Sequence, residues 1–291
     1  MDFWAALWRH LNAARGHELL RLVDLKRGPR SMNQSAIRKL CSTAYLGDET
    51  VLCRVLGRYK MFVDSTDVGL SSHLMLDGYW EMWLTEALAQ VIKPGMVAVD
   101  IGANLGYFTL LMADLVGPCG AVHAFEPNPA MAARLIKSAD VSGFRERVSL
   151  YPDPLGSEDG QELFLVIPHG EPKNAHLTPH AIAGALPVTL RRFDSHPALL
   201  EADVIKIDVE GAEREIWRGM AGLLERRDKP LTIFLEFASI RYDNPAAFLD
   251  EIEAHGFSLG DVHLNLGVQT RTREQILAAP PRVDQMLVLR R

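Results

Sequence analysis

A glycine loop follows the first strongly apolar strand-like run of the chain, and its composition indicates what it could bind. The run VAVDIG (97–102) continues into the loop DIGANLG (100–106). A dinucleotide-binding loop has the pattern GxGxxG and holds a pyrophosphate at a helix N-terminus. Here Gly102 and Gly106 form GxxxG, and the preceding Asp100 would repel a pyrophosphate and attract a cation. The spacing therefore favours S-adenosylmethionine, which carries a sulfonium and an ammonium group beside its adenosine.

A second acidic residue supports this cofactor. Glu126 ends the next strand-like run, where an acid can accept hydrogen bonds from both ribose hydroxyls. Glu126 alone also fits a dinucleotide, whereas Asp100 together with Glu126 favours S-adenosylmethionine. Asn128 follows, and with Pro129 it predicts a helix start. The simpler alternatives are an N-cap role for Asp100 and tight turns at the two glycines.

Two further carboxylates, Asp208 and Glu210, follow the buried run VIKI in the segment IDVEGAE (207–213). They would point the same way if the strand continued. One could take the proton of an attacking hydroxyl. Together with Glu236 they could instead hold a divalent metal, which we favour less. The alternative is that Glu210 caps the next helix while Glu213 pairs with a neighbouring arginine on a solvated face.

His176 and Glu81 are the remaining candidate site residues. His176 lies in the loop 168–185, and a neutral imidazole is a good general base near neutral pH. A solvated loop histidine is the alternative. Glu81 belongs to the segment 79–92, which has a helical pattern and precedes the glycine loop. It could line the methionine end of the cofactor or be an ordinary exposed acid.

The elements that must position these residues alternate from residue 97 onward. Strands are expected at 97–102, 121–126, 147–152, 203–208, 231–237 and 285–290, with helices between most of them. This alternation predicts an α/β fold, a mostly parallel sheet with helices on both faces, in which ligands bind beyond the carboxyl ends of the strands. The stretch 155–192 interrupts the alternation with two antiparallel strands, 162–167 and 186–191, around a long loop.

Three parts of the chain are expected. Residues 1–48 form a helical extension with a linker at 26–35, residues 49–95 a strand hairpin that turns at Gly57 and a helix, and residues 96–291 the cofactor-binding domain with its insertion at 155–192. An apolar stripe in the first helix predicts packing on its own domain or on a second copy, which gives a homodimer. The alternative is a helix at a membrane surface.

Composition excludes several classes of protein. Of the 291 residues, 48% are hydrophobic and 23% charged, which excludes general disorder. The net charge of -6 argues against nucleic acid as the main partner. No apolar run is long enough for a transmembrane segment, and nothing resembles a secretory signal. Three scattered cysteines without a CxxC pair predict neither disulfides nor zinc, and fit a cytoplasmic location.

Three segments together resemble the FkbM-type S-adenosylmethionine-dependent methyltransferases: VAVDIGANLGYFTLLMA, AVHAFEPNP and DVIKIDVEGAEREIWRGM. The resemblance covers about residues 50–291. It implies a Rossmann-like class I methyltransferase fold of seven strands and methyl transfer to a hydroxyl oxygen of a small molecule, sugar or glycan. It also carries over Asn104 with the glycine loop, Asp153 near the adenine, Asp208 at the fourth strand and His176 near the pocket. Pro154 departs from the family pattern and puts Asp153 in doubt.

The expected function is therefore S-adenosylmethionine-dependent O-methylation of a small molecule or glycan. One alternative is a cofactor-binding interaction subunit without catalysis, against which the intact Gly102, Gly106 and Asp208 argue. The other is a methyltransferase that acts on RNA or protein, and the acidic composition counts against RNA. The sequence carries no chemistry that identifies the acceptor.

Overall fold

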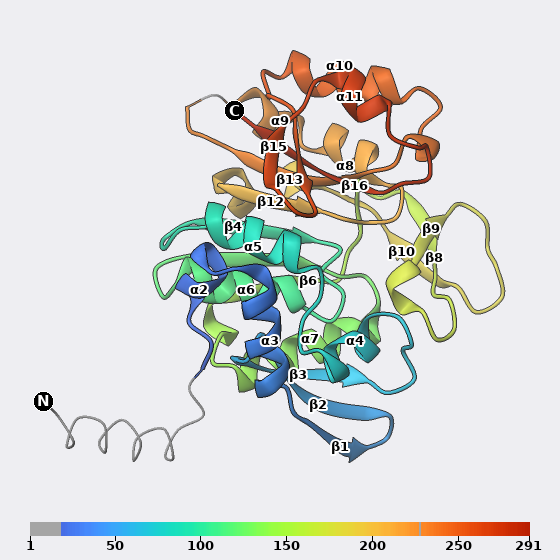
Figure 1. The fold of residues 1–291 in the computed structure, drawn as a ribbon. Helices are drawn as coiled ribbons and strands as arrows, with labels where there is room; N and C mark the ends of the chain where they lie inside the picture. The colour runs from blue at the N-terminus through green and yellow to red at the C-terminus, as the bar shows by residue number, and fades with distance from the viewer. Residues whose placement is uncertain (1–18, 227) are drawn as a thin grey trace, which may run out of the picture.

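The computed structural model describes residues 19–226 and 228–291, and its centre is an eight-stranded sheet (Figure 1). The strands follow the order β15-β14-β16-β13-β12-β4-β5-β6. Their bounds are β4 Val97–Ile101, β5 Ala121–Phe125, β6 Val148–Tyr151, β12 Val204–Ile207, β13 Thr232–Phe237, β14 Gly260–His263, β15 Gly267–Thr270 and β16 Gln285–Arg290. Strands β4, β5, β6, β12 and β13 run parallel, while β16 lies antiparallel between β13 and β14. The mostly parallel sheet predicted from the sequence is confirmed, with β14 and β15 as two additional strands at one edge.

Helices cover both faces of this sheet. The bounds are α2 Leu22–Arg27, α3 Arg30–Leu40, α4 Leu70–Leu76, α5 Met82–Val91, α6 Tyr107–Val116, α7 Pro129–Val141, α8 Glu213–Gly219, α9 Ala221–Glu225, α10 Pro245–Ala254 and α11 Arg273–Leu277. Alternate strand residues enter two separate apolar clusters, because successive side chains of a strand point to opposite faces. Ala98 and Val204 pack with α5 and α6, whereas Val99 and Ile205 pack with α8 and α10. No helix among the described residues is long and apolar enough to cross a membrane.

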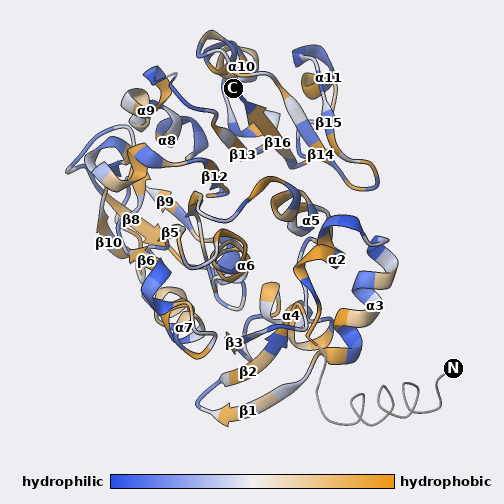
Figure 2. Cartoon of the chain, turned by 90° about the vertical axis from the view of Figure 1, so that its left-hand side faces the viewer, coloured by the Kyte–Doolittle hydropathy of each residue, from blue (hydrophilic) through white to orange (hydrophobic). Residues whose placement is uncertain are grey.

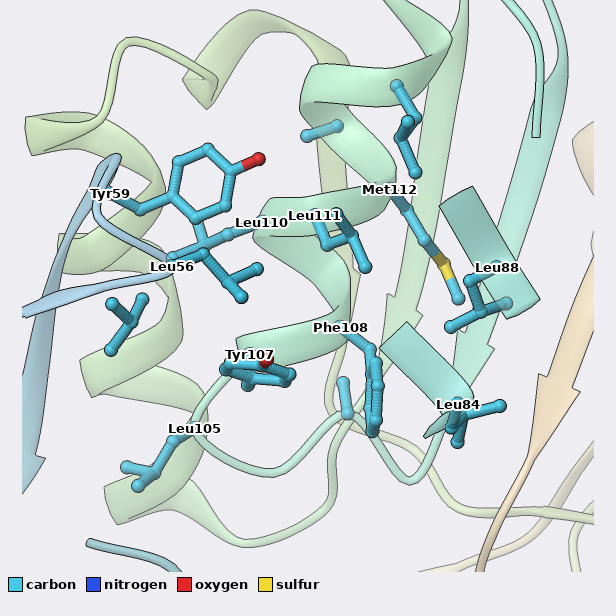
Figure 3. Packing of buried hydrophobic residues seen from close by; sticks show 14 of the residues in the cluster. Leu56, Tyr59, Leu84, Leu88, Leu105, Tyr107, Phe108, Leu110, Leu111 and Met112 are labelled. Atoms are coloured by element: carbon cyan, nitrogen blue, oxygen red, sulfur yellow. The ribbon is translucent and has the colours of Figure 1, made fainter. Parts of the chain in front are cut away.

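Helix α6 begins directly after the glycine loop and runs through the centre of the molecule in the view of Figure 2. Nine of its ten residues are buried, because apolar partners meet it from several directions. Figure 3 shows Leu56 of the hairpin turn and Tyr59, which begins the following strand, on one side of α6. Leu84 and Leu88 of α5 lie on another side. This packing holds the N-terminal end of α6, and therefore the glycine loop, in a fixed place.

The N-terminal part is continuous with the same core. Strands β1 Thr43–Gly47, β2 Thr50–Val55 and β3 Tyr59–Asp64 form an antiparallel sheet, so the hairpin turning at Gly57 is confirmed and β1 is an additional strand. The linker expected at 26–35 is wrong, because most of it lies in α3, which begins after Pro29. Ile37 of α3 is fully buried, so tertiary packing outweighs the turn-like composition. The apolar stripe of the first helix lies mostly outside the described residues.

The insertion forms a small sheet of its own beside the main one (Figure 1). Strands β8 Glu162–Val166 and β10 Leu186–Thr189 pair antiparallel, as the sequence predicts, and β9 His176–Thr178 adds a third strand from within the long loop. Two short strands, β7 Leu155–Gly156 and β11 Arg191–Arg192, pair at its base. The insertion thereby carries its loop over the carboxyl ends of the central strands.

Candidate active site

Two cavities meet beyond the carboxyl ends of β4 and β12. The larger has a volume of about 480 Å³ and the smaller about 80 Å³. Five residues line both of them: Gly102, Asn104, Lys173, Asp208 and Glu210. Because ligands of open α/β sheets bind at this edge, the pair of cavities is the candidate active site.

The junction of the two cavities depends on a close approach of two backbone segments at Gly102. Its φ is +77°, and a Cβ atom there would lie 1.9 Å from the carbonyl oxygen of Asp208. The Asp208 N–H in turn donates to the carbonyl of Ile101 at 3.2 Å. Only glycine fits both the conformation and the space, so this residue sets how closely the ends of β4 and β12 approach each other.

The smaller cavity combines apolar walls with one buried carboxylate, Glu126. Its apolar residues include Phe125, Leu155 and Val209. Glu126 is 7% exposed, and its two oxygens accept the backbone N–H groups of Asn104 at 2.7 Å and of Asn128 at 2.8 Å. Burial raises the pKa of Glu126 to about 7 in spite of these two hydrogen bonds. Each carboxylate oxygen has a further lone pair, so the residue can still accept hydroxyl groups of a ligand.

A buried charge pair lies beneath the junction. Asp100 is fully buried and accepts a hydrogen bond from the Thr109 hydroxyl at 2.6 Å, while its Oδ1 has no hydrogen-bond partner among the described residues. The Nζ of Lys206, one strand away in register, lies 3.5 Å from Asp100 and 3.1 Å from Asp208. The ammonium also sits over the ring of Phe108. Burial opposes the charge of Lys206, but Asp208 and Asp100 outweigh it and raise its pKa.

The larger cavity is lined by five carboxylates: Glu81, Asp208, Glu210, Glu236 and Asp284. Glu81 has a φ of +35°, an uncommon value for a residue other than glycine. Its carboxylate makes no hydrogen bond to the residues that the structure describes. Burial and the neighbouring Asp208 raise the pKa of Glu81 to about 7. Burial and Asp208 likewise raise the pKa of Glu236 to about 8. The cavity therefore contains acidic groups that its own cations do not fully compensate.

Arg241 is the main cation that pairs with these carboxylates. Its guanidinium contacts Glu210 at 2.9 Å and Asp284 at 3.1 Å, and it is also paired with Glu236 and, at 3.5 Å, with Glu213. The carboxylate oxygens of Asp208, Glu210 and Glu236 lie within 4.8 Å of one another, as a divalent metal would require. Lys206 and Arg241 already contact these three groups, so the cluster has internal cations.

The structure brings most of the predicted site residues to this edge and leaves others aside. Glu81, Gly102, Asn104, Glu126, Asp208 and Glu210 line one or both cavities. Gly106 adopts the left-handed conformation at the start of α6, and the Asn128 side chain caps α7 by accepting the Ala130 N–H at 3.0 Å. His176 lines the smaller cavity, as do Asp208 and Glu210, whereas Asp100 and Asp153 line neither cavity and the adjacent Pro154 lines the smaller one.

Three details differ from the sequence-based alternatives. Strand β12 ends at Ile207, and Glu210 has a φ of +56°. The strand therefore does not continue through Asp208 and Glu210, and the alternation of a strand is not what brings both side chains to the cavity. Ala212, not Glu210, stands at the N-cap of α8. Glu213 is fully buried and bonded to the backbone of its own turn and to Tyr242, which excludes the solvated pair with a helix neighbour.

Several residues of the site were not identified from the sequence: Lys206, Arg241, Trp80, Trp83, Lys173 and Asp284. A signal did exist for Lys206, since a lysine inside an apolar strand is rarely buried unless it is paired. The others stand in loops, in short 3-10 helices or at the start of α5, where their convergence depends on the tertiary fold.

Comparison with known proteins identifies the family. The family described as "Methyltransferase FkbM domain" matches residues 100–259, more than half of the chain. The chain belongs to the FkbM methyltransferase family. It is accordingly an S-adenosylmethionine-dependent methyltransferase, and its mostly parallel sheet with helices on both faces is the class I methyltransferase fold.

Relatives share only parts of this methyltransferase. The 31-O-demethyl-FK506 methyltransferase FkbM of Streptomyces tacrolimicus is 39% identical over 77 residues, which cover 21% of this chain and 29% of that protein. The AMB antimetabolite synthetase AmbE of Pseudomonas aeruginosa is 25% identical over 225 residues, which cover 62% of this chain and 10% of that protein. The chain thus spans less than a third of the length of either relative. Among solved structures, TYW2 of P. horikoshii in complex with MeSAdo has a TM-score of 0.47 at 15% identity and covers 84% of this chain and 72% of its own.

Proposed function

We propose that the chain is an O-methyltransferase that transfers the methyl group of S-adenosylmethionine to a hydroxyl of a small molecule, sugar or glycan. The observation that carries the proposal is the meeting of two chemically different cavities at Gly102 and Asp208. One cavity suits an apolar, hydroxyl-bearing nucleoside, and the other offers carboxylates to a cation.

The residues at this edge fit the cofactor. The apolar walls of the smaller cavity would hold the adenine, and the Glu126 oxygens would accept the ribose hydroxyls. Gly102 and Asp208 line both cavities, so a ligand that occupies both would pass beside them. In the larger cavity, Glu81 and Asp208 would receive the ammonium and favour the sulfonium by charge. When bound, the cofactor supplies an electrophilic methyl group.

The chain itself must orient the acceptor and receive its proton. Asp208 and Glu210 are the two carboxylates that line both cavities, and we assign the proton to Asp208, which directly follows β12. Its Oδ2 is paired with Lys206 at 3.1 Å, which leaves Oδ1 to accept a hydrogen bond from the acceptor hydroxyl and then its proton. Holding the hydroxyl in line with the methyl group supplies much of the remaining rate. Glu210 would help to orient the acceptor, and His176, which lines only the smaller cavity, is not assigned this role.

Asp208→Asn tests the assignment. The change keeps the shape of the side chain and removes its charge, so the protein should fold while turnover falls about a hundredfold or more if Asp208 takes the proton. The assay follows transfer of labelled methyl from S-adenosylmethionine to a panel of hydroxylated small molecules and glycans, and calorimetry follows cofactor affinity. Asp140→Asn, on the exposed surface of α7, is the matched control. Asp208→Asn with the turnover of the control would remove Asp208 from the reaction, and label on nitrogen or carbon rather than oxygen would exclude O-methylation.

A further inference from the structure

We propose that the acceptor of this site is a hydroxylated amine, such as an amino sugar or another amino alcohol. Its protonated amino group binds in the larger cavity, between the five carboxylates and the indole rings of Trp80 and Trp83. This inference rests on the proposed function, because it names the class of molecule whose hydroxyl is methylated. The inference follows from the charges and from the aromatic residues of the larger cavity.

The charges of the cavity do not balance. Five carboxylates line it, and two more, Asp100 and Glu213, lie behind it against the same cations. Three cations face these seven groups, namely Lys173, Lys206 and Arg241. Arg241 alone is shared by Glu210, Glu213, Glu236 and Asp284. S-adenosylmethionine brings one net positive charge, so a negative excess remains after the cofactor is bound.

Two of these carboxyl groups, Glu81 and Glu236, are partly protonated near neutral pH. Burial and the neighbouring Asp208 raise the pKa of Glu81 to about 7 and that of Glu236 to about 8. Even with both of them neutral, five carboxylates face three cations and one cofactor charge. A second cation is therefore favoured in the cavity, and its binding would release protons.

The remaining wall of the cavity suits an organic cation. The half-buried indoles of Trp80 and Trp83 line it on the α5 side. Trp80 already holds one ammonium in this way, since Lys173 Nζ lies 5.3 Å from the centre of its ring. Indole faces also pack against the apolar faces of sugar-like rings. A hydrated divalent ion would gain nothing from these rings and would have to compete with Lys206 and Arg241 for the carboxylates.

Matched pairs of ligands test the inference. Glucosamine, 2-deoxystreptamine and 2-amino-1-phenylethanol are each compared with their N-acetyl derivatives, which keep the hydroxyls and lose the charge. Binding to the full chain is measured by saturation-transfer NMR at constant ionic strength, with and without S-adenosylhomocysteine. We expect the amines to bind at least about tenfold more tightly than their partners, the ratio that about 1.4 kcal/mol of charge attraction gives.

Two variants and a control locate the preference. Glu236→Gln should reduce the preference several-fold, and Asp284→Asn, whose side chain is half exposed and whose loss is easily tolerated, should reduce it in the same direction. Glu253→Gln on the exposed face of α10 should leave it unchanged. Equal binding of amines and N-acetyl partners, including no binding by either, would overturn the inference. So would displacement of the amines by magnesium chloride alone. Failure to bind S-adenosylhomocysteine would instead refute the proposed function, and the measurements without it keep the two results separate.

Discussion

Lys206→Met examines the buried charge pair beneath the junction of the two cavities. Methionine keeps most of the apolar stem but removes the ammonium that faces Asp100 and Asp208. The two carboxylates differ in solvation, since the side chain of Asp100 is 1% exposed and that of Asp208 is 28% exposed. Asp100 is therefore the group left without compensation. Removing one partner of a buried pair costs about 3–5 kcal/mol, a large share of the roughly 5–15 kcal/mol that stabilises a folded domain.

Urea unfolding followed by circular dichroism measures this cost. The double variant Lys206→Met with Asp100→Asn should recover most of the loss, because neutralising the carboxylate removes the stranded charge. Lys229→Met is the control, since Lys229 pairs with Asp203 at 3.1 Å in a partly exposed position, where a pair is worth about 0–1 kcal/mol. Equal losses for Lys206→Met and Lys229→Met, or no recovery in the double variant, would refute the role given to the pair.

Four further outcomes are expected. Gly102→Ala should destabilise the fold and weaken S-adenosylmethionine binding more than Gly95→Ala, because both have positive φ but only the first brings a Cβ against a backbone oxygen; equal effects in unfolding and calorimetry would contradict this. Folding raises the pKa of Glu81 to about 7 and that of Glu236 to about 8, so the cofactor-free protein should lose stability as pH rises from about 5 to 8. Affinity for the cationic cofactor should rise over the same range. Glu81→Gln should flatten both the stability curve and the affinity curve. A chelator should leave cofactor binding and turnover unchanged, because Lys206 and Arg241 already contact the three carboxylates that could hold a metal, Asp208, Glu210 and Glu236; activity restored by magnesium would contradict it. Deleting residues 2–18 should shift sedimentation toward a monomer and leave cofactor affinity intact, and an unchanged sedimentation coefficient would refute the dimer.

The sequence predicts the central part of the fold well because strand and helix patterns alternate clearly there. The glycine loop and Glu126 could be placed at strand ends, since parallel strands bring their carboxyl ends to one edge. The peripheral strands β1, β9, β14 and β15 are short, and their pairing depends on distant segments. The helix at Arg30–Leu40 was hidden by a turn-like composition that buried contacts of Ile37 outweigh.

The site is less predictable than the fold for the same reason. Asp208 stands directly after a recognisable strand. Asp284 lines the larger cavity from a loop, and Arg241, at the end of the short 3-10 helix Ser239–Arg241, pairs with the carboxylates from behind the cavity. Their meeting around Glu210 and Glu236 is a property of the folded sheet, in which β16 returns beside β13. The sequence indicates carboxylates at this edge, and only the folded chain shows which cations compensate them.

Calorimetry with S-adenosylmethionine, S-adenosylhomocysteine and NAD tests the central claim most directly. The account predicts saturable binding of the first two at one site per chain, weakened by Glu126→Gln, and no heat from NAD. Binding of NAD without a signal from S-adenosylmethionine would contradict it, because the carboxylates that line the larger cavity would then face a pyrophosphate.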